Sequence, residues 1–409
     1  MSARFHLYPL DVCLFRDSRP FSPEEMQRAV SVSATPPGTA LYGALRDLLL
    51  SHHGIAYADF HQGKFDEEVK EVVGERPEKP GSLRIRGPFL SETTDMGTTD
   101  YLPWPSDLLT VIRESDRRTG YLSPTTSGCA NLPEEAAPLD VAVRLDEGKF
   151  RWCREDEAIE AEQEDAPFEA TAEALSGYLC LREAWPQRAA GLVLSEPHTG
   201  IERSAGTYTA RSGHLFTVEF LRLRGPAKRG FECEAKAHYS IEIDKGAEQF
   251  PDKAMMALGG ERRPFLFERA PANVEPAWAG ARKEVELHLV RHGFDNQGRL
   301  CFRLYLLSPA PFAGGWKPAL PGEYELIGGA VGKPIMISGW DVKGKRPRTS
   351  RKYAPAGSVY FVRTKASPQS REEAVKQVLD RFWPGSLCET EEDSKMGFGN
   401  VLIGGMANV

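Results

Sequence analysis

Apolar and polar residues alternate near the start of the chain, and apolar residues then recur at helical spacing. Residues 4–15, RFHLYPLDVCLF, predict a strand, because successive side chains of a strand point to opposite faces. In PPGTALYGALRDLLLSH, residues 36–52, Pro36, Pro37 and Gly38 end a loop, and a helix with Thr39 as its cap is predicted to follow. Its apolar face carries Leu41, Leu45, Leu48 and Leu49. A second strand is predicted at SLRIRGPFL, residues 82–90.

The same patterns return in the second half of the chain. Strands are predicted at residues 212–223, 237–244, 265–269, 285–294, 357–363 and 400–404. The stretch DKAMMAL, residues 252–258, predicts a short helix, and GGERRP after it predicts a turn. A longer helix is predicted over residues 370–383, with Ser370 as cap and Glu373 as its capping-box partner.

Two passages share the order strand, helix, glycine-rich turn and strand, which fits two α/β units in one chain. The simplest unit of this kind is the ferredoxin-like fold, an antiparallel sheet with two helices on one face. The linker is expected near residues 270–280, which are rich in Pro, Ala and Gly. Residues 155–169 hold eight acidic residues and no basic one, and we interpret them as the solvated face of an insertion.

Composition limits the possible functions. The net charge of −7 argues against a generic nucleic-acid binder but leaves room for a local basic groove. Seven scattered cysteines without a CxxC pair indicate free thiols in a reducing compartment. The start of the chain has no apolar signal region, and no window approaches 18 apolar residues. We therefore expect a soluble cytoplasmic protein.

Glycine-rich motifs raise the question of a nucleotide cofactor. In KMGFGNVLIGG, Gly397 and Gly399 begin a dinucleotide-binding pattern, but Leu402 occupies the third glycine position and only seven residues follow. In GGAVGKP, a phosphate loop would need glycine at Ile327 and a hydroxyl at Pro334. We expect no cofactor. The loop at residues 395–405 is then a structural turn or a place where something approaches the backbone closely.

Seven phrases occur in an informative order. They are YPLDVCLFRDSRPF, ATPPGTALYGALRDLLL, TGIERSAGTYTARSGHLFTVEFLRL, ALGGERRPFLFE, ISGWDVKGKRPR, YAPAGSVYFVR and MGFGNVLIGG. This ordered set resembles the third subunits of the Cmr complex, the type III-B CRISPR RNA-silencing machine. These subunits belong to the RAMP superfamily, in its group resembling the fifth Cas family. The resemblance is weakest over residues 107–183.

The resemblance implies an α+β fold of two ferredoxin-like (RRM-like) domains with insertions and a β-hairpin thumb. The domains would span residues 1–280, with an insertion at about 91–200 and a thumb at about 195–220, and residues 281–409. The resemblance also implies a non-catalytic, RNA-binding subunit that holds the 5′ tag of the guide crRNA in antiviral defence. Its protein partners would be the large polymerase-like subunit and the backbone subunit. The thumb, centred on residues 201–214, would lie near target RNA.

Residues suited to RNA contact occur in several of these phrases. Arginines can fork onto phosphates, aromatic rings can stack on bases, and glycines let a backbone approach. The strongest basic run, residues 343–352, has six cations and no acid, with Trp340 beside it. The candidates are Arg16, Arg19, Phe21, Gly38, Arg46, Arg203, Gly259, Gly260, Arg262, Trp340, Lys345, Arg346, Arg348, Lys395, Gly397, Phe398 and Gly399.

Each group of candidates keeps an alternative interpretation. Arg16 and Asp17 could form an ordinary surface pair, and GGERRPF could be a plain turn. The basic run could face an acidic protein partner, and the thumb could dock on a neighbouring subunit. Direct RNA contact by this chain therefore competes with a pure scaffold role.

Candidate catalytic groups are weaker. His52 and His53 are the most suggestive general acid–base pair, since metal-free RNA cleavage often uses histidine, but such pairs also complement a helix C-terminus. His198 and His214 flank the thumb. The spacing of His288 and His292 would suit a metal on a helix, but their stretch is predicted as a strand. Asp95, Asp100 and Asp107 are scattered acids that could bind Mg²⁺. We predict no catalytic activity and no metal; the alternative is a metal-independent endoribonuclease that processes CRISPR repeat RNA.

Overall fold

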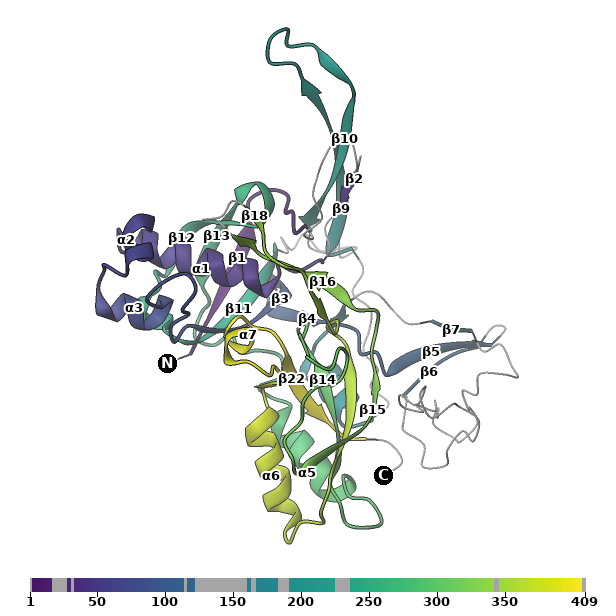
Figure 1. The fold of residues 1–409 in the computed structure, drawn as a ribbon. Helices are drawn as coiled ribbons and strands as arrows, with labels where there is room; N and C mark the ends of the chain where they lie inside the picture. Colours follow the sequence, from purple (N-terminus) through teal and green to yellow (C-terminus); the bar gives the residue numbers. More distant parts are fainter. Residues whose placement is uncertain are drawn as a thin grey trace.

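The computed structural model contains two large antiparallel sheets and a hairpin that extends away from both (Figure 1). The structure describes residues 2–16, 28–30, 33–113, 116–121, 160–162, 167–182, 191–224, 236–341 and 346–406. The fold is therefore mixed α/β with several antiparallel sheets, in agreement with the α+β class predicted from the sequence. Within the described part of the chain, no helix has the length and apolar character needed to cross a membrane.

The N-terminal sheet has seven strands, and every neighbouring pair is antiparallel. Alternation sorts its side chains, because Phe5, Leu7 and Ile241 enter one core while His6 and Ser240 face the other side. The strand order is β12 (Lys253–Leu258), β13 (Arg263–Arg269), β1 (Ala3–Pro9), β11 (Lys236–Lys245), β3 (Arg84–Thr94), β4 (Gly97–Leu102) and β8 (Phe168–Glu169). The start of the predicted insertion thus continues this sheet.

Helix α1 (Gly38–His52) covers the sheet together with α3 (Glu67–Val73), and α2 (Tyr57–Gln62) lies between them in the chain. The predicted leucine face is confirmed, since all four leucines are buried. The predicted Thr39 cap is wrong. The N-cap position is Pro37, which has no side-chain acceptor, and the Thr39 hydroxyl donates instead to the carbonyl of Ser338 at 3.4 Å.

The stretch DKAMMAL is a strand, β12, and not the predicted helix. Alanine and methionine favour helices, but the chain here pairs along its whole length with β13, and tertiary pairing overrides a weak local propensity. Consequently, the repeated order of elements inferred from the sequence fails in its first copy. The glycine turn after it is a 3₁₀ turn, Gly260–Arg262, between two strands.

The C-terminal sheet has the order β15 (Tyr324–Ala330), β20 (Val359–Thr364), β14 (Cys301–Leu306), β22 (Asn400–Gly404) and β21 (Gly385–Ser386), again antiparallel throughout. Helices α5 (Arg282–His292) and α6 (Arg371–Phe382) pack against each other and against β22. Helix α4 (Ala172–Leu179) contacts the same layer. The core of this sheet also includes Leu102, Leu108 and Phe168, so segments from the predicted insertion are part of it.

The structure confirms the predicted helix α6 and corrects the strand predicted where α5 lies. Ser370 caps α6 by accepting from the N–H of Glu373 at 3.2 Å, which confirms the predicted helix start. Residues 285–292, predicted as a strand, belong to α5 instead. Val285 and Leu289 are both fully buried one turn apart, and this helical period was hidden by Leu287, the apolar residue between them.

The predicted thumb region forms a long hairpin of β9 (Val193–Arg203) and β10 (Ala210–Leu223), with β2 (Arg28–Val30) parallel to β10. Figure 1 shows this hairpin extending from the body of the molecule. Its base is held by a bridge between Cys13 and Leu221, whose N–H and C=O groups bond reciprocally at 2.7 and 2.8 Å. A separate small sheet contains β5 (Leu108–Arg113), β6 (Asp116–Tyr121) and β7 (Glu160–Glu162). Most of the acidic stretch 155–169 lies outside the described residues.

Candidate nucleic-acid interface

The predicted basic run lies in an extension of the C-terminal half that consists of two short pairs of antiparallel β-strands. It comprises β16 (Ile335–Ile337) with β19 (Arg351–Tyr353) and β17 (Trp340–Asp341) with β18 (Arg346–Pro347), both antiparallel. We call residues 335–341 and 346–353 the basic ribbon. It crosses to the start of α1, because Ser338 accepts the hydrogen bond from Thr39 (Figure 1). Sequence-distant cations and the N-terminal helix are thereby brought together.

The cations of the basic ribbon differ in their partners. Arg348 and Lys352 are exposed, so both can reach a phosphate from solvent. Arg351 is half-exposed but forms two hydrogen bonds to the carboxylate of Asp393, at 2.8 and 3.1 Å, and these raise its pKa. Trp340 lies in β17 and Arg346 in β18, so both belong to the basic ribbon. Lys345 lies outside the described residues.

The last glycine loop is buried, contrary to the prediction that it touches RNA. Gly397 and Gly399 both have positive φ, 80° and 66°, and neither is exposed. A Cβ on Gly397 would come within 2.6 Å of the carbonyl oxygen of Gly87, and one on Gly399 within 2.8 Å of the sulfur of Cys388. The close approach inferred from the sequence therefore exists, but protein backbone and a thiol make it.

The neighbours of this loop are also committed to protein contacts. Phe398 is 1% exposed and packs against Tyr353, with ring centroids 4.9 Å apart and ring planes tilted by 43°, so its ring is not accessible to a base. Gly38 is buried beneath the carbonyl of Met396 and the ring of Phe398. Lys395 is 16% exposed and pairs with Glu391 at 3.3 Å. We therefore remove these residues, with Gly397 and Gly399, from the predicted RNA surface.

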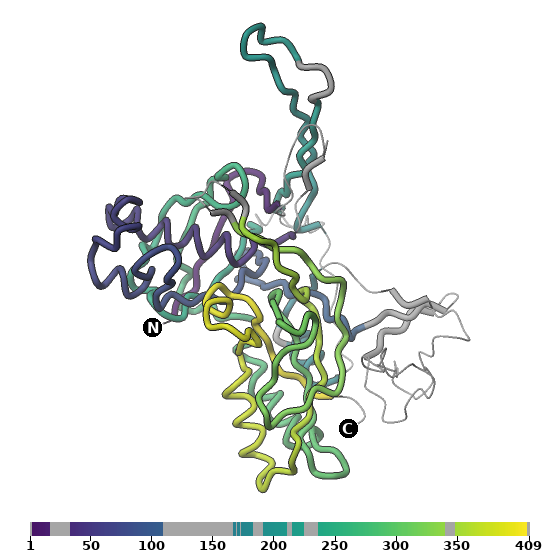
Figure 2. Tube along the Cα trace, in the orientation of Figure 1, coloured from purple at the N-terminus to yellow at the C-terminus, as the bar shows by residue number. Residues whose placement is uncertain are grey.

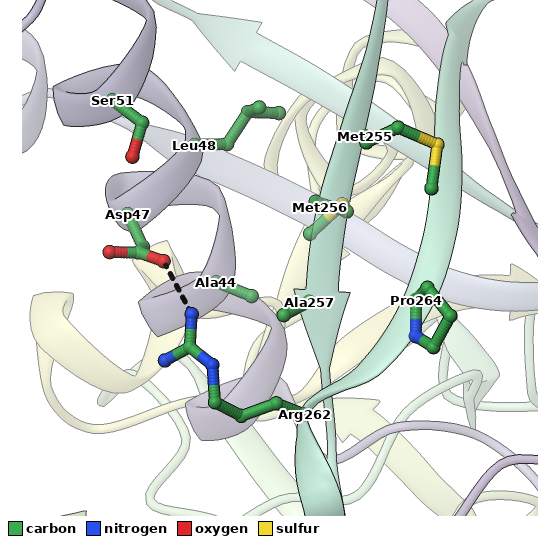
Figure 3. A pocket seen from close by; sticks show the side chains of 9 residues that line it. All are labelled: Ala44, Asp47, Leu48, Ser51, Met255, Met256, Ala257, Arg262 and Pro264. Atoms are coloured by element: carbon green, nitrogen blue, oxygen red, sulfur yellow. Dashed lines mark ion pairs between the residues drawn. The ribbon is translucent and has the colours of Figure 1, made fainter.

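The first glycine turn is more open. Gly259 has φ 79°, and its Cβ would come within 2.6 Å of the Leu14 carbonyl, which also accepts from the N–H of Gly260. Arg262 after this turn is 81% exposed and faces Asp47 at 3.8 Å. Figure 3 shows the two side chains at the edge of a shallow cavity of about 250 Å³ between α1 and β12. Arg262 is thus available to a ligand, whereas the glycines pack on the chain.

The remaining candidates are divided between structure and surface. Arg46 is half-buried: its guanidinium donates to the carbonyls of Pro77 and Arg76 at 2.9 and 2.8 Å and lies over Phe60. Burial lowers its pKa. These contacts make Arg46 a structural residue, contrary to the RNA role predicted for it. Arg203 is exposed at the far end of β9, and Arg16 is partly exposed. Arg19 and Phe21 lie outside the described residues.

The histidine candidates do not converge. His52 and His53 are exposed at the end of α1, with ring centroids 5.2 Å apart. His198 pairs with Glu196 at 2.7 Å on the hairpin. His288 and His292 are one turn apart on α5, so the helical spacing rejected from the sequence is real. However, the ring of His288 packs tightly on Gly405.

Two of the scattered acids are used in buried ion pairs. Asp100 accepts from Arg4 and from the hydroxyl of Ser91, and Asp107 accepts from Arg303 and from the hydroxyl of Tyr178. Asp95 lies in the turn between β3 and β4. Among the described residues, no three His, Cys, Asp or Glu side chains are arranged to hold a metal ion.

A cluster of rings that the sequence analysis missed lies on the second face of the N-terminal sheet. The rings of His6 and His238 are 4.2 Å apart, and the Tyr8 hydroxyl lies 3.1 Å from Nδ1 of His6. Burial, followed by the neighbouring charges, lowers the pKa of His6 to about 3 and that of His238 to about 4. Alternation along the two strands could have indicated this shared face. Both imidazoles are neutral at neutral pH and covered by protein.

A family model for CRISPR-associated proteins, Cas_Cmr3, matches residues 5–406. The chain belongs to this family, which confirms the resemblance predicted from the ordered phrases. No curated protein matches the chain.

Solved structures resemble the chain only distantly. A chain of the type III-B Cmr-beta complex bound to cognate target RNA and AMPPnP is 13% identical, with a TM-score of 0.47 over 98% of this chain and 96% of that one. The same complex bound to cognate target RNA gives 14% identity and 0.47 over the same shares. A chain of the Csm3–Csm4 subcomplex of a type III-A complex gives 11% and 0.30, over 90% and 97%. These TM-scores are low, so the family match alone supports the assignment.

Proposed function

We propose that this chain is a non-catalytic, RNA-binding subunit of a type III-B CRISPR effector complex. It holds the 5′ tag of the guide crRNA and joins the large polymerase-like subunit to the backbone subunits, in antiviral defence. Membership of the Cas_Cmr3 family over nearly the whole chain supports this proposal. The two sheets would correspond to ferredoxin-like domains of residues 1–280 and 281–409.

The observation that carries RNA binding is the exposed charge of the basic ribbon. Arg348 and Lys352 project from a thin strand pair in a protein whose net charge is −7. Cations that neutralise phosphates release condensed counterions, which gives favourable and salt-dependent binding. Arg46 lies close enough to repel Arg348, so a further anion there would relieve like-charge repulsion. The phosphate backbone of RNA is therefore the partner that suits the exposed cations Arg348 and Lys352.

The hairpin of β9 and β10 supports a second contact, with target RNA. Tyr208 at its tip is 74% exposed and has a positive φ of 54°. Its N–H donates to the carbonyl of Ser204 at 2.8 Å, and the hydroxyls of Thr207 and Thr209 lie 2.7 Å apart, so the turn is held internally. Arg203 is exposed next to it. An exposed ring and a cation on an ordered tip suit stacking and phosphate contact.

The basic ribbon can be tested by removing its two exposed cations. The variant Arg348→Ala/Lys352→Ala should bind guide RNA more weakly and with a shallower dependence of log K on log salt, by roughly one phosphate for each cation. The matched control is Lys365→Ala/Lys376→Ala, which removes two exposed cations beside or on α6. An unchanged salt slope in the ribbon variant, or an equal change in the control, would place the basic ribbon against protein or solvent.

The alternative function is metal-independent cleavage of CRISPR repeat RNA, and the exposed pair His52–His53 favours it. Helix α1 has 15 residues, so this pair lies about 22 Å from the helix start near the ribbon. Incubation of the purified chain with labelled repeat RNA separates the two functions. Cleavage that His52→Ala/His53→Ala abolishes would overturn the non-catalytic assignment.

A scaffold without RNA contact is the third class. Crosslinking of guide RNA in the assembled complex distinguishes this scaffold role from the proposed RNA-binding role. We expect crosslinked peptides that contain Arg16, Arg262 or Arg348. Crosslinks confined to other subunits would contradict the RNA-binding assignment but would not contradict membership of the complex.

A further inference from the structure

The loop of residues 396–399 lies where three parts of the molecule meet. Figure 2 shows the yellow C-terminal segment at the junction between the N-terminal and C-terminal layers. Successive residues of the loop face different parts. Met396 packs against the core of the N-terminal sheet, and Phe398 packs against the basic ribbon. Gly399 donates its N–H to Pro309 at 2.9 Å, within the C-terminal half.

The contacts with the N-terminal sheet require glycine on both sides. Gly397 lies against Ile85 and Gly87 of β3, and Gly38 at the start of α1 lies against the carbonyl of Met396. A Cβ on either glycine would meet backbone atoms, which cannot move aside as a flexible side chain would. Arg84 of β3 adds a hydrogen bond to Ser394 at 2.7 Å. This contact therefore fixes a close and specific distance.

The contacts with the basic ribbon come from the same short segment. Phe398 packs with Ile337 and Tyr353, one from each of the paired strands β16 and β19. Asp393, three residues before the loop, holds Arg351 with two hydrogen bonds, and its own carbonyl accepts from the N–H of Phe398 at 3.2 Å. One rigid turn therefore touches α1, β3 and both strands of the ribbon.

We propose that residues 396–399 are a positioning joint that sets where the basic ribbon lies relative to α1. The loop acts on RNA through this placement and not by contact with RNA, and that part of the inference rests on the proposed function. A turn that merely reverses the chain would pack on its own sheet alone. A loop that cradles phosphates would present its amides to solvent, whereas residues 397–399 are buried.

The variant that tests the joint most directly is Gly38→Ala. Gly38 has an ordinary helical backbone, and alanine favours a helix, so any harmful effect reports the contact with Met396 and not backbone strain. The matched control is Gly43→Ala in the same helix, where a Cβ would meet nothing within 4 Å. Gly397→Ala is a less clean variant, because its φ of 80° adds strain.

The experiment measures energy transfer between dyes on the full chain, placed at exposed residues Asp59 of α2 and Thr349 of the ribbon. Genetically encoded amino acids carry the dyes, because the chain has seven cysteines. Gly38→Ala should change the mean transfer efficiency without RNA, whereas Gly43→Ala should match the unsubstituted chain. RNA affinity of Gly38→Ala should fall several-fold with a shallower salt slope, although no cation is removed.

The outcomes separate this inference from the proposed function. If the unsubstituted chain binds no guide RNA, the proposed function fails, and energy transfer still tests the joint. If Gly38→Ala lowers the melting temperature but leaves the transfer efficiency unchanged, the loop is only a packing element and the inference is overturned. If Gly38→Ala does not fold, Phe398→Leu replaces it; this variant keeps an apolar side chain but loses the ring contact with Tyr353. Unchanged transfer in that variant overturns the inference equally.

Discussion

The molecule uses arginine in opposite ways in its interior and on the basic ribbon. Arg303 is 1% exposed, and its guanidinium donates to Asp107 and to the carbonyls of Tyr178 and Gly405. Arg348 is exposed, and its charge weakly repels that of Arg46. The first arrangement satisfies a buried charge completely, and the second leaves charge unsatisfied at the surface. Arg303 therefore stabilises the fold, whereas Arg348 can meet a ligand from solvent.

The largest expected effect comes from breaking the buried pair. Arg303→Leu leaves Asp107 charged and unpaired in the core, which costs about 3–5 kcal/mol of the free energy of unfolding. Urea denaturation measures this loss. The double variant Arg303→Leu/Asp107→Leu should recover part of it, because no buried charge then remains unpaired. A single-variant loss below about 1 kcal/mol would show that the comparison between interior and ribbon is wrong.

The second prediction concerns acid stability and the buried, neutral His6–His238 pair. Their folded pKa values, about 3 and about 4, lie below the unfolded value of 6.5, so the unfolded chain binds protons more readily. The stability that they contribute is complete above pH 6.5 and is lost as the pH falls toward 4. By pH 5, each imidazole has lowered the free energy of unfolding by about 2 kcal/mol relative to its value above pH 6.5. The groups that face His6 are Arg4, Tyr8 and His238.

The measurement is the free energy of unfolding between pH 7 and pH 5. His6→Phe keeps a ring of similar size and should reduce the loss of stability between pH 7 and pH 5 by about 2 kcal/mol, the share of one imidazole. His52→Phe is the control, because His52 is exposed on the surface of α1. Equal pH profiles for His6→Phe and the unsubstituted chain would contradict the burial argument.

Arg46 allows a third prediction, because its burial is intermediate between that of Arg303 in the interior and that of Arg348 on the basic ribbon. Arg46→Met keeps an unbranched side chain near Phe60 but leaves the carbonyls of Pro77 and Arg76 without their donor. We expect a loss of about 1–2 kcal/mol in the free energy of unfolding. RNA affinity, measured with protein that is fully folded, should stay within twofold or so of the unsubstituted chain. A large loss of affinity without loss of stability would return Arg46 to the RNA surface.

Local patterns in the sequence predicted the elements whose packing is simple. Helix α1 is confirmed, and the strand predicted over residues 4–15 is confirmed only for its first half, because β1 ends at Pro9. DKAMMAL was predicted wrongly because its pairing with β13 is a tertiary fact that propensity does not contain. Helix α5 was missed because Leu287, which is 48% exposed, breaks the apparent period of its buried face.

The candidate site was predictable only where its signal is local. A run of cations within ten residues identified the basic ribbon. The partners of the glycine loop could not be read in the same way, because Gly87 and Gly38 are far from it in the chain. The sequence correctly indicated that something approaches Gly397 closely, and only the tertiary structure identifies it as the carbonyl of Gly87. Likewise, Arg303 and Asp107 are 196 residues apart.

The smallest expected effect on stability completes the contrast with Arg303. Arg348→Ala should change the free energy of unfolding by no more than about 0.5 kcal/mol, because its side chain is exposed and lies near a like charge. At low salt, where the repulsion between Arg46 and Arg348 is least screened, the substitution should slightly raise the free energy of unfolding. Urea denaturation at two salt concentrations measures both effects. A loss above about 1 kcal/mol would mean that Arg348, like Arg303, holds the fold together, and the basic ribbon would then have one fewer cation to offer an RNA backbone.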